Sequence, residues 1–243
     1  MSDALKNIRV VLCETHHAGN IGAAARAMKT MGLHALVLVQ PGSFPDREAT
    51  RRASRAVDVL DNARVCATLG NALAGVTLAV ACTARTREMA APLVDARSAA
   101  ARLAAVAATQ PVALVFGNET FGLTTAQVNH CQLVATIPSD PDYASLNLAA
   151  AVQVFAYEVR LALLDATPRP KPRALATQEK IEGFFTHLES ALLDCGFLNP
   201  RQPKKLMQRL RRLYARAELE PEEVNILRGM IRTLRQPKSA KNT

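Results

Sequence analysis

Three segments of this chain combine glycine or proline with small polar side chains, and each one follows an apolar run. They are THHAGNIGAAARA at 15–27, GNETFGL at 117–123 and IPSDPDYASLNLAAA at 137–151. Glycine allows a ligand to approach the backbone closely, and the start of a helix offers free N–H groups. Together, the three segments predict one composite binding pocket.

The common ligand-binding motifs do not account for these segments. His16 and His17 are not accompanied by carboxylates or cysteines at metal-ligand spacing, so we expect no metal site. Gly19 and Gly22 form half of a dinucleotide fingerprint, but neither the full G-x-G-x-x-G nor a Walker A sequence is present. Ser145 lacks the G-x-S-x-G context of a hydrolase nucleophile, and a serine before a helix is more often an N-cap.

The elements that must position these segments alternate along the first 165 residues. We expect strands at 8–14, 34–40, 63–69, 76–84, 111–117 and 131–138, and helices at 20–32, 46–60, 98–108 and 145–164. This alternation predicts an α/β fold with a mostly parallel sheet. Ligands of such sheets bind beyond the carboxyl ends of the strands, where the three segments begin.

The last third of the chain has a different character. Residues 166–174, ATPRPKPRA, contain three prolines among three basic residues and are typical of an extended linker. Helical patterns follow at 177–195, 201–217 and 221–235. We therefore expect a domain at 1–165, a linker at 166–176 and a small α-helical extension at 177–243.

Positive charge is concentrated in this extension. The net charge is +1 over residues 1–165 and +8 over residues 166–243. A concentrated positive field favours a polyanionic partner such as nucleic acid, although a solvated helical face would have the same composition. Six basic residues are expected on one helix, namely Lys204, Lys205, Arg209, Arg211, Arg212 and Arg216.

Composition places the chain among globular proteins. Hydrophobic residues make up 49% of its 243 residues, which is enough for a large core. No apolar run reaches the roughly 18 residues of a membrane span, and charges interrupt the first fifteen residues, unlike a secretory signal. The five cysteines are far apart and form no C-x-x-C, which is typical of a reducing compartment. We expect a cytoplasmic protein without a membrane partner.

In their order, the three segments resemble the motifs of the SPOUT superfamily of RNA methyltransferases. The first motif is similar to residues 20–26, the second to 116–123, and the third to 137–138 followed by 145–149. The resemblance covers residues 5–165 closely and the extension loosely. Within the superfamily, the chain is similar to the enzymes that methylate the 2′-oxygen of cytidine or uridine at position 32 of the tRNA anticodon loop.

The resemblance implies a cofactor, S-adenosylmethionine, which would leave as S-adenosylhomocysteine. The cofactor would lie in a C-terminal trefoil knot, a feature that sequence patterns alone do not predict. The resemblance also implies a homodimer through the knot region, with Glu119 supporting the dimer or the cofactor loop. The implied cofactor-binding residues are Cys82, Thr83, Ala84, Gly117, Gly122, Leu123, Ile137, Ala144, Ser145 and Leu146.

The resemblance further implies catalytic roles for Arg26, Asn20 and Ser145. A guanidinium stays protonated in proteins, so we expect Arg26 to clamp a phosphate and stabilise the developing 2′-oxyanion instead of acting as a base. Asn20 and Ser145 would orient the ribose or phosphate. Arg87 and the basic residues of the extension would contact tRNA.

Two alternatives remain at this point. A methyltransferase of the same fold could act on rRNA or on another tRNA site, because a fold does not determine its substrate. A non-catalytic RNA-binding module would keep the basic extension but would need no cofactor pocket. The presence of Arg26, Gly117, Gly122, Ser145 and Asn147 favours an enzyme over such a module.

Overall fold

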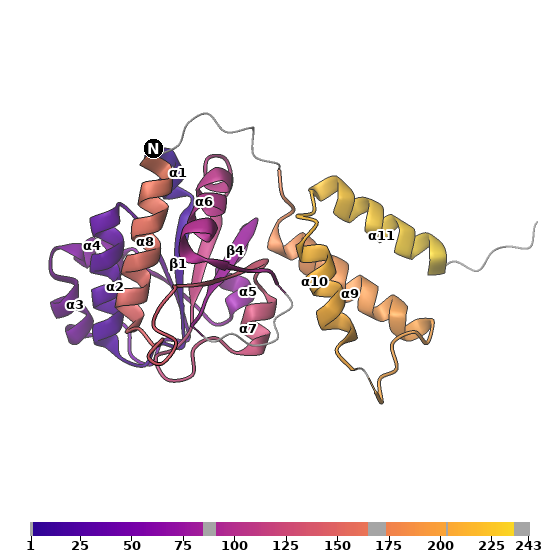
Figure 1. Cartoon of the computed structure of the whole chain (residues 1–243), viewed down its shortest axis with the longest axis horizontal. Helices are drawn as coiled ribbons and strands as arrows, with labels where there is room; N and C mark the ends of the chain where they lie inside the picture. Colours follow the sequence, from indigo (N-terminus) through magenta and orange to yellow (C-terminus); the bar gives the residue numbers. More distant parts are fainter. Residues whose placement is uncertain (1, 85–90, 165–173, 203, 236–243) are drawn as a thin grey trace, which may run out of the picture.

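The computed structural model describes residues 2–84, 91–164, 174–202 and 204–235, and Figure 1 shows their arrangement. Its described strands form one seven-stranded sheet in the order β3-β2-β1-β6-β4-β7-β5, and each recorded strand pair is parallel. The strands are β1 Ile8–Cys13, β2 Ala35–Val39, β3 Arg64–Cys66, β4 Leu78–Cys82, β5 Leu93–Asp95, β6 Val112–Phe116 and β7 Leu133–Thr136. The predicted α/β class with a parallel sheet is confirmed.

Helices cover both faces of the sheet, as the continuous apolar strands require. β4 and β6 are buried along their whole length, and an apolar cluster lies on each side of them. The larger cluster includes residues from α2 Ala18–Met31, α3 Arg47–Ala53, α4 Val57–Asp61, α6 Ala96–Ala107 and α8 Leu148–Leu164. The smaller cluster includes residues from α5 Leu69–Ala72 and α7 Thr125–Asn129.

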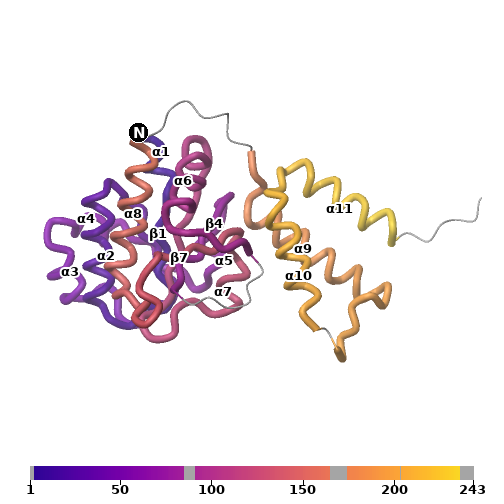
Figure 2. Tube along the Cα trace, viewed as in Figure 1, coloured from indigo at the N-terminus to yellow at the C-terminus, as the bar shows by residue number. Residues whose placement is uncertain are grey.

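The close packing of α2 against α3 depends on Gly22. A Cβ atom at this position would overlap the backbone carbonyl of Ala49. The first motif segment is therefore locked against α3 on one side, while α8 lies along α2 on the other side (Figure 2). This packing fixes the start of α2 relative to the sheet.

Several element boundaries differ from the sequence prediction for local reasons. The structure adds α1 Ser2–Lys6, β5 and α7, which are too short for their periodicity to be recognised. α8 begins at Leu148 and not at 145, because Asn147 Oδ1 accepts a hydrogen bond from the Ala149 N–H in the manner of an N-cap. The predicted linker lies largely outside the described residues, since 165–173 are not described.

The C-terminal unit consists of α9 Gln178–Asp194, α10 Leu206–Ala215 and α11 Pro221–Arg235. Its core includes Phe184 and Tyr214, whose rings meet edge to face with centroids 4.9 Å apart. The helix predicted at 201–217 is shorter, because a turn in which the Gln202 N–H bonds the Asn199 carbonyl precedes it. In the described ranges, no helix is long and apolar enough to cross a membrane.

Candidate active site

A cavity lies beyond the carboxyl ends of β4, β6 and β7, where the start of α8 closes it. It is lined by Cys82, Thr83, Ala84, Phe116, Gly117, Asn118, Glu119, Thr120, Gly122, Ile137, Ala144, Ser145, Leu146, Leu148, Ala151 and Phe155. The second and third motif segments thus meet at one place, as predicted. Nine of the ten expected cofactor residues line the cavity, whereas the Leu123 side chain is buried in the smaller apolar cluster.

The second motif forms a tight turn at the cavity wall. The Asn118 carboxamide oxygen accepts hydrogen bonds from the N–H groups of Thr120 at 3.1 Å and Phe121 at 2.6 Å. Gly122 has a φ of +67°, and a Cβ on Gly117 would overlap the backbone of Gly122. The turn therefore needs glycine at both positions, and it exposes its backbone groups to the cavity.

Glu119 ties this turn to the first motif. Its carboxylate accepts hydrogen bonds from the backbone N–H of His16 at 3.1 Å and of His17 at 3.2 Å, and from Asn20 Nδ2 at 2.9 Å. The carboxylate thus lies at the start of α2, where free N–H groups and the helix dipole favour negative charge. His16 and His17 contribute to the site through their backbone N–H groups.

The third motif joins the same network through Asn147. Its Nδ2 donates to Asn20 Oδ1 at 3.0 Å, while its own Oδ1 receives the Ala149 N–H. Asn20 therefore donates to Glu119 and accepts from Asn147. One chain of hydrogen bonds connects all three motif segments.

The protonation states follow from these surroundings. Partial burial opposes ionisation of Glu119, but the hydrogen bonds from Asn20 and from backbone N–H groups outweigh it and lower the pKa of Glu119. Burial raises the pKa of the Cys82 thiol well above its ordinary value, with a further contribution from Cys131. Cys82 is therefore a neutral wall residue at pH 7 and not a nucleophile.

The expected catalytic residues do not all reach the cavity. Ser145 lines it, and Asn20 is linked to it through Glu119 and Asn147. Arg26 is exposed on α2 and is not among the lining residues. Within the described part of the chain, its guanidinium has no hydrogen-bond or ion-pair partner. Arg87 lies outside the described residues.

Sequence reasoning missed the α8 side of the cavity. Leu148, Ala151 and Phe155 contribute to the wall, and the Phe155 ring meets Phe116 edge to face with centroids 5.6 Å apart. The only available signal was the helical apolar periodicity of this segment. That periodicity is the same for a side chain in a sealed core and for one at a cavity wall.

The basic residues of the extension separate into two groups. Lys204, Lys205, Arg209, Arg212 and Arg216 are exposed, as expected for RNA contacts. Arg211 instead faces inward. Its guanidinium donates to both Glu182 oxygens at 2.7 and 2.8 Å and lies 4.3 Å from the centre of the Phe185 ring. Arg211 therefore contributes to packing in place of the predicted RNA contact.

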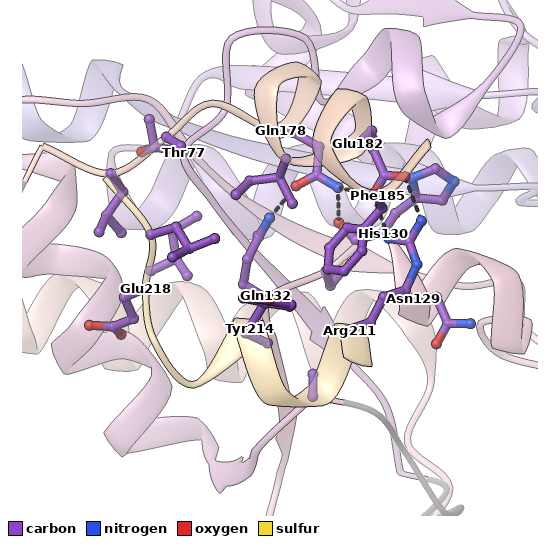
Figure 3. A pocket seen from close by; sticks show the side chains of 18 of the residues that line it. Thr77, Asn129, His130, Gln132, Gln178, Glu182, Phe185, Arg211, Tyr214 and Glu218 are labelled. Atoms are coloured by element: carbon purple, nitrogen blue, oxygen red, sulfur yellow. Dashed lines mark hydrogen bonds and ion pairs between the residues drawn. The ribbon is translucent and has the colours of Figure 1, made fainter. Parts of the chain in front are cut away.

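Arg211 lines a second pocket, which lies between the sheet domain and the helical unit (Figure 3). Gln178 is only 4% exposed there and connects the two parts. Its side chain accepts from Gln132 Nε2 and donates to the His130 carbonyl at 2.7 Å. The Gln178 backbone N–H also bonds the Val76 carbonyl at 2.9 Å. These contacts fix the first turn of α9 against the edge of the sheet domain.

Comparison with known proteins gives matches along both parts of the chain. Residues 7–157 match the SpoU rRNA Methylase family, and residues 179–243 match the C-terminal domain of the tRNA methyltransferase TrmJ. The tRNA (cytidine/uridine/adenosine-2′-O-)-methyltransferase TrmJ of Pseudomonas aeruginosa (strain UCBPP-PA14) is 50% identical over 239 residues. The alignment covers 93% of each chain.

Solved structures agree with these matches. The crystal structure of TrmJ from Z. mobilis ZM4 has a TM-score of 0.82 and 33% identity, and the match covers 94% of this chain and 99% of that one. An AdoMet-bound rRNA methyltransferase from Sinorhizobium meliloti has a TM-score of 0.53 and 25% identity, with 65% of this chain and 57% of that chain covered.

Proposed function

The chain belongs to the SpoU rRNA Methylase family, and we propose that it methylates the ribose 2′-oxygen of cytidine or uridine in tRNA. The methyl donor is S-adenosylmethionine, and the target is position 32 of the anticodon loop. The observation that carries the proposal is the convergence of the second and third motifs on one cavity, with the first motif joined to them through Asn20. The tRNA activity of the 50% identical relative supports the substrate class.

The cavity fits the adenosine part of this cofactor. Phe116 and Phe155 give it an apolar wall, and the loops at 83–84, 117–120 and 144–146 bring backbone polar groups to its rim. An apolar wall with backbone donors and acceptors at its rim suits an uncharged heteroaromatic ring. When bound, the cofactor supplies an electrophilic methyl group. The residues proposed to hold it are Cys82, Thr83, Ala84, Gly117, Gly122, Ile137, Ala144, Ser145 and Leu146.

The chain contributes mainly positioning, which can lower the barrier of such a transfer by about 7–11 kcal/mol. Arg26 binds the phosphate next to the target ribose and stabilises negative charge as it develops on the 2′-oxygen. Its guanidinium does not accept the 2′-hydroxyl proton, because arginine stays protonated in proteins. The Ser145 hydroxyl orients the ribose at the cavity wall. Asn20 holds the first motif in place beside the second and third motifs through Glu119 and Asn147.

We also propose that the chain forms a homodimer, in which a second copy covers the exposed side of α8. The α8 face that includes Val152, Phe155 and Val159 is core. The opposite face carries an apolar stripe at four- and three-residue spacing, with Tyr157 47% and Leu164 55% exposed. The stripe consists of Ala150, Val154, Tyr157, Leu161 and Leu164.

Arg26 lies close to this proposed interface. Thr30, one helical turn after Arg26, donates a hydrogen bond to Gln153 of α8 at 3.4 Å. A dimer through α8 would therefore place the exposed Arg26 side chain beside a second copy of the chain. Sedimentation of the purified protein tests this, since Y157D should convert the dimer to a monomer while the fold is retained.

The remaining parts of the proposal concern topology and RNA contacts. We propose that the chain forms a trefoil knot around the cavity, with β4 lying between β6 and β7 in the sheet. We place the domain boundary at 166–176.

The exposed cations of the helical unit contact tRNA phosphates, so the affinity for tRNA should fall as the salt concentration is raised. The enzyme would act in the cytoplasm, where its substrate tRNA occurs.

The proposal is tested by incubating the purified protein with labelled S-adenosylmethionine and a set of unmodified tRNA transcripts. The methylated nucleotide is then mapped. A 2′-O-methyl group at position 32 is the expected product. Methylation at another position, or of rRNA alone, would contradict the proposed target but retain the reaction. Binding of tRNA without any methyl transfer would favour the alternative of a non-catalytic RNA-binding module.

A further inference from the structure

We propose that the turn between α9 and α10 is a receptor for one unpaired nucleotide of the RNA substrate. The inference rests on the proposed function, because it assigns a second RNA contact to that enzyme. The turn carries a cleft whose lining includes Phe197, Asn199, Gln202, Lys204, Lys205 and Arg209. An aromatic ring, two carboxamides and three cations thus meet in one place.

The exposure of Phe197 is the first observation that points to a ligand. Its ring is 69% exposed, although its neighbour Leu198 is 5% exposed and both other phenylalanines of the helical unit are buried. Leaving such a side chain in water forgoes the favourable free energy that its burial would give. Exposed aromatic rings are the usual platform on which proteins stack unpaired RNA bases.

The ring is presented by an ordered backbone. The Leu198 N–H bonds the Leu192 carbonyl at 2.9 Å, and the Gly196 N–H bonds the Leu193 carbonyl at 3.1 Å. On the other side, the Arg201 N–H donates to Asn199 Oδ1 at 2.9 Å. Because these bonds already hold the backbone on both sides of Phe197, stacking on the ring would require little additional ordering.

The charge of the turn agrees with a nucleotide. Residues 195–217 contain seven basic side chains and no acidic one. Lys204 and Arg209 line the cleft, and neither has an ion-pair partner within the described ranges. Phosphates on both sides of a stacked base would neutralise this charge. A base inside a duplex already has both faces covered, so the chemistry selects an unpaired nucleotide.

The position of the cleft indicates which kind of RNA reaches it. In Figure 1, the turn lies at the lower end of the helical unit, apart from the sheet domain that carries the candidate active site. A short RNA fragment would contact one of these places at a time. A folded tRNA is large enough to contact both, so the cleft would bind a nucleotide remote from the methylated one.

The absence of tryptophan from the sequence allows a direct test. F197W introduces one fluorescent ring into the cleft, and the matched control I226W places one on α11 at a side chain that is 61% exposed. Unmodified tRNA and a single-stranded oligonucleotide should quench the F197W protein strongly, whereas a blunt RNA duplex should not. The I226W protein should show little quenching with any of these RNAs.

Affinity measurements complete the test. F197A and F197L should each weaken tRNA binding about tenfold, while F197W and F197Y should bind as the wild type does, because only a ring can stack. Equal affinity of F197A and wild type, or no quenching of F197W by tRNA, would overturn the inference. If the wild type methylates tRNA in that case, the proposed function still stands. If F197W is quenched but no RNA is methylated, the proposed function fails and the receptor stands.

Discussion

The Asn147 carboxamide donates a hydrogen bond to Asn20 at 3.0 Å, although 127 residues separate the two. Asn147 also caps the first turn of α8 through the Ala149 N–H. One side chain therefore fixes where α8 starts and holds the first motif beside it. The geometry of the candidate site therefore depends on this amide, although Asn147 does not line the cavity.

We expect N147A to impair both stability and catalysis. Loss of the cap should lower the free energy of unfolding by about 1 kcal/mol, and the freed Asn20 should lower kcat more than it raises KM for the cofactor. Thermal unfolding and single-turnover methyl transfer measure the two effects. The control N225A changes an exposed asparagine on α11 and should leave both unchanged. A fully active N147A protein would contradict the role of the link.

The charge of Glu119 should make the site sensitive to acid. Its lowered pKa means that its contribution to stability is complete above the ordinary glutamate value of about 4.3. The contribution is lost as the pH falls through the still lower pKa of the folded state. E119Q should therefore be less stable than wild type at pH 7, by about 1–3 kcal/mol, and the difference should shrink in acid. Denaturant unfolding at pH 7, 5 and 3 measures this, and a difference independent of pH would refute it.

Gly117 should tolerate no side chain. A Cβ at this position would overlap the backbone of Gly122, so G117A must open the second-motif turn. We expect loss of S-adenosylmethionine binding by calorimetry, with the protein still folded by circular dichroism. The matched control is G229A, because a Cβ on Gly229 of α11 meets nothing within 4 Å. G229A should bind normally and gain about 0.5–1 kcal/mol of stability. Normal cofactor binding by G117A would show that the turn is not part of the cofactor site.

Arg26 should affect transfer and not cofactor binding, since it is exposed and outside the cavity lining. R26A should reduce kcat by about 100-fold or more, the loss typical of removing a group that stabilises a transition-state oxyanion. R26K should remain well below wild type, because an ammonium lacks the two-pronged geometry that binds phosphate. Filter-based methylation assays and calorimetry separate the two effects. Full activity of R26K would exclude the clamp.

Arg211 should behave as a packing residue. R211A leaves Glu182 without its ion-pair partner beside the Phe185 ring, so we expect a loss of about 1–3 kcal/mol in unfolding free energy. The double variant E182A/R211A should recover part of that loss, because no unpaired charge remains. R212A, on the exposed side of α10, should instead weaken tRNA binding without altering stability. If R211A instead weakened tRNA binding without altering stability, Arg211 would be an RNA contact as the sequence predicted.

Local information in the sequence was sufficient for most of the fold. The apolar runs at 111–117 and 76–84 became β6 and β4, and the pattern at 221–235 became α11 with the same limits. These predictions were correct because strand burial and helix amphipathicity depend on the pattern of residues that are close together in the chain. For the same reason, the three motif segments could be recognised as parts of one site and the positive charge located in the extension.

The tertiary structure decided which of these residues meet. The pairing of β1 with β6 brings Glu119 to Asn20, and the packing of α10 against α9 places Arg211 beside Glu182. Arg26 is left exposed on α2, outside the cavity lining. No spacing along the chain encodes such contacts, because each joins segments that are separated in sequence and become adjacent only when the elements pack together. The sequence by itself determined the elements and the chemical groups that they carry, and the packing of those elements determined which groups act together.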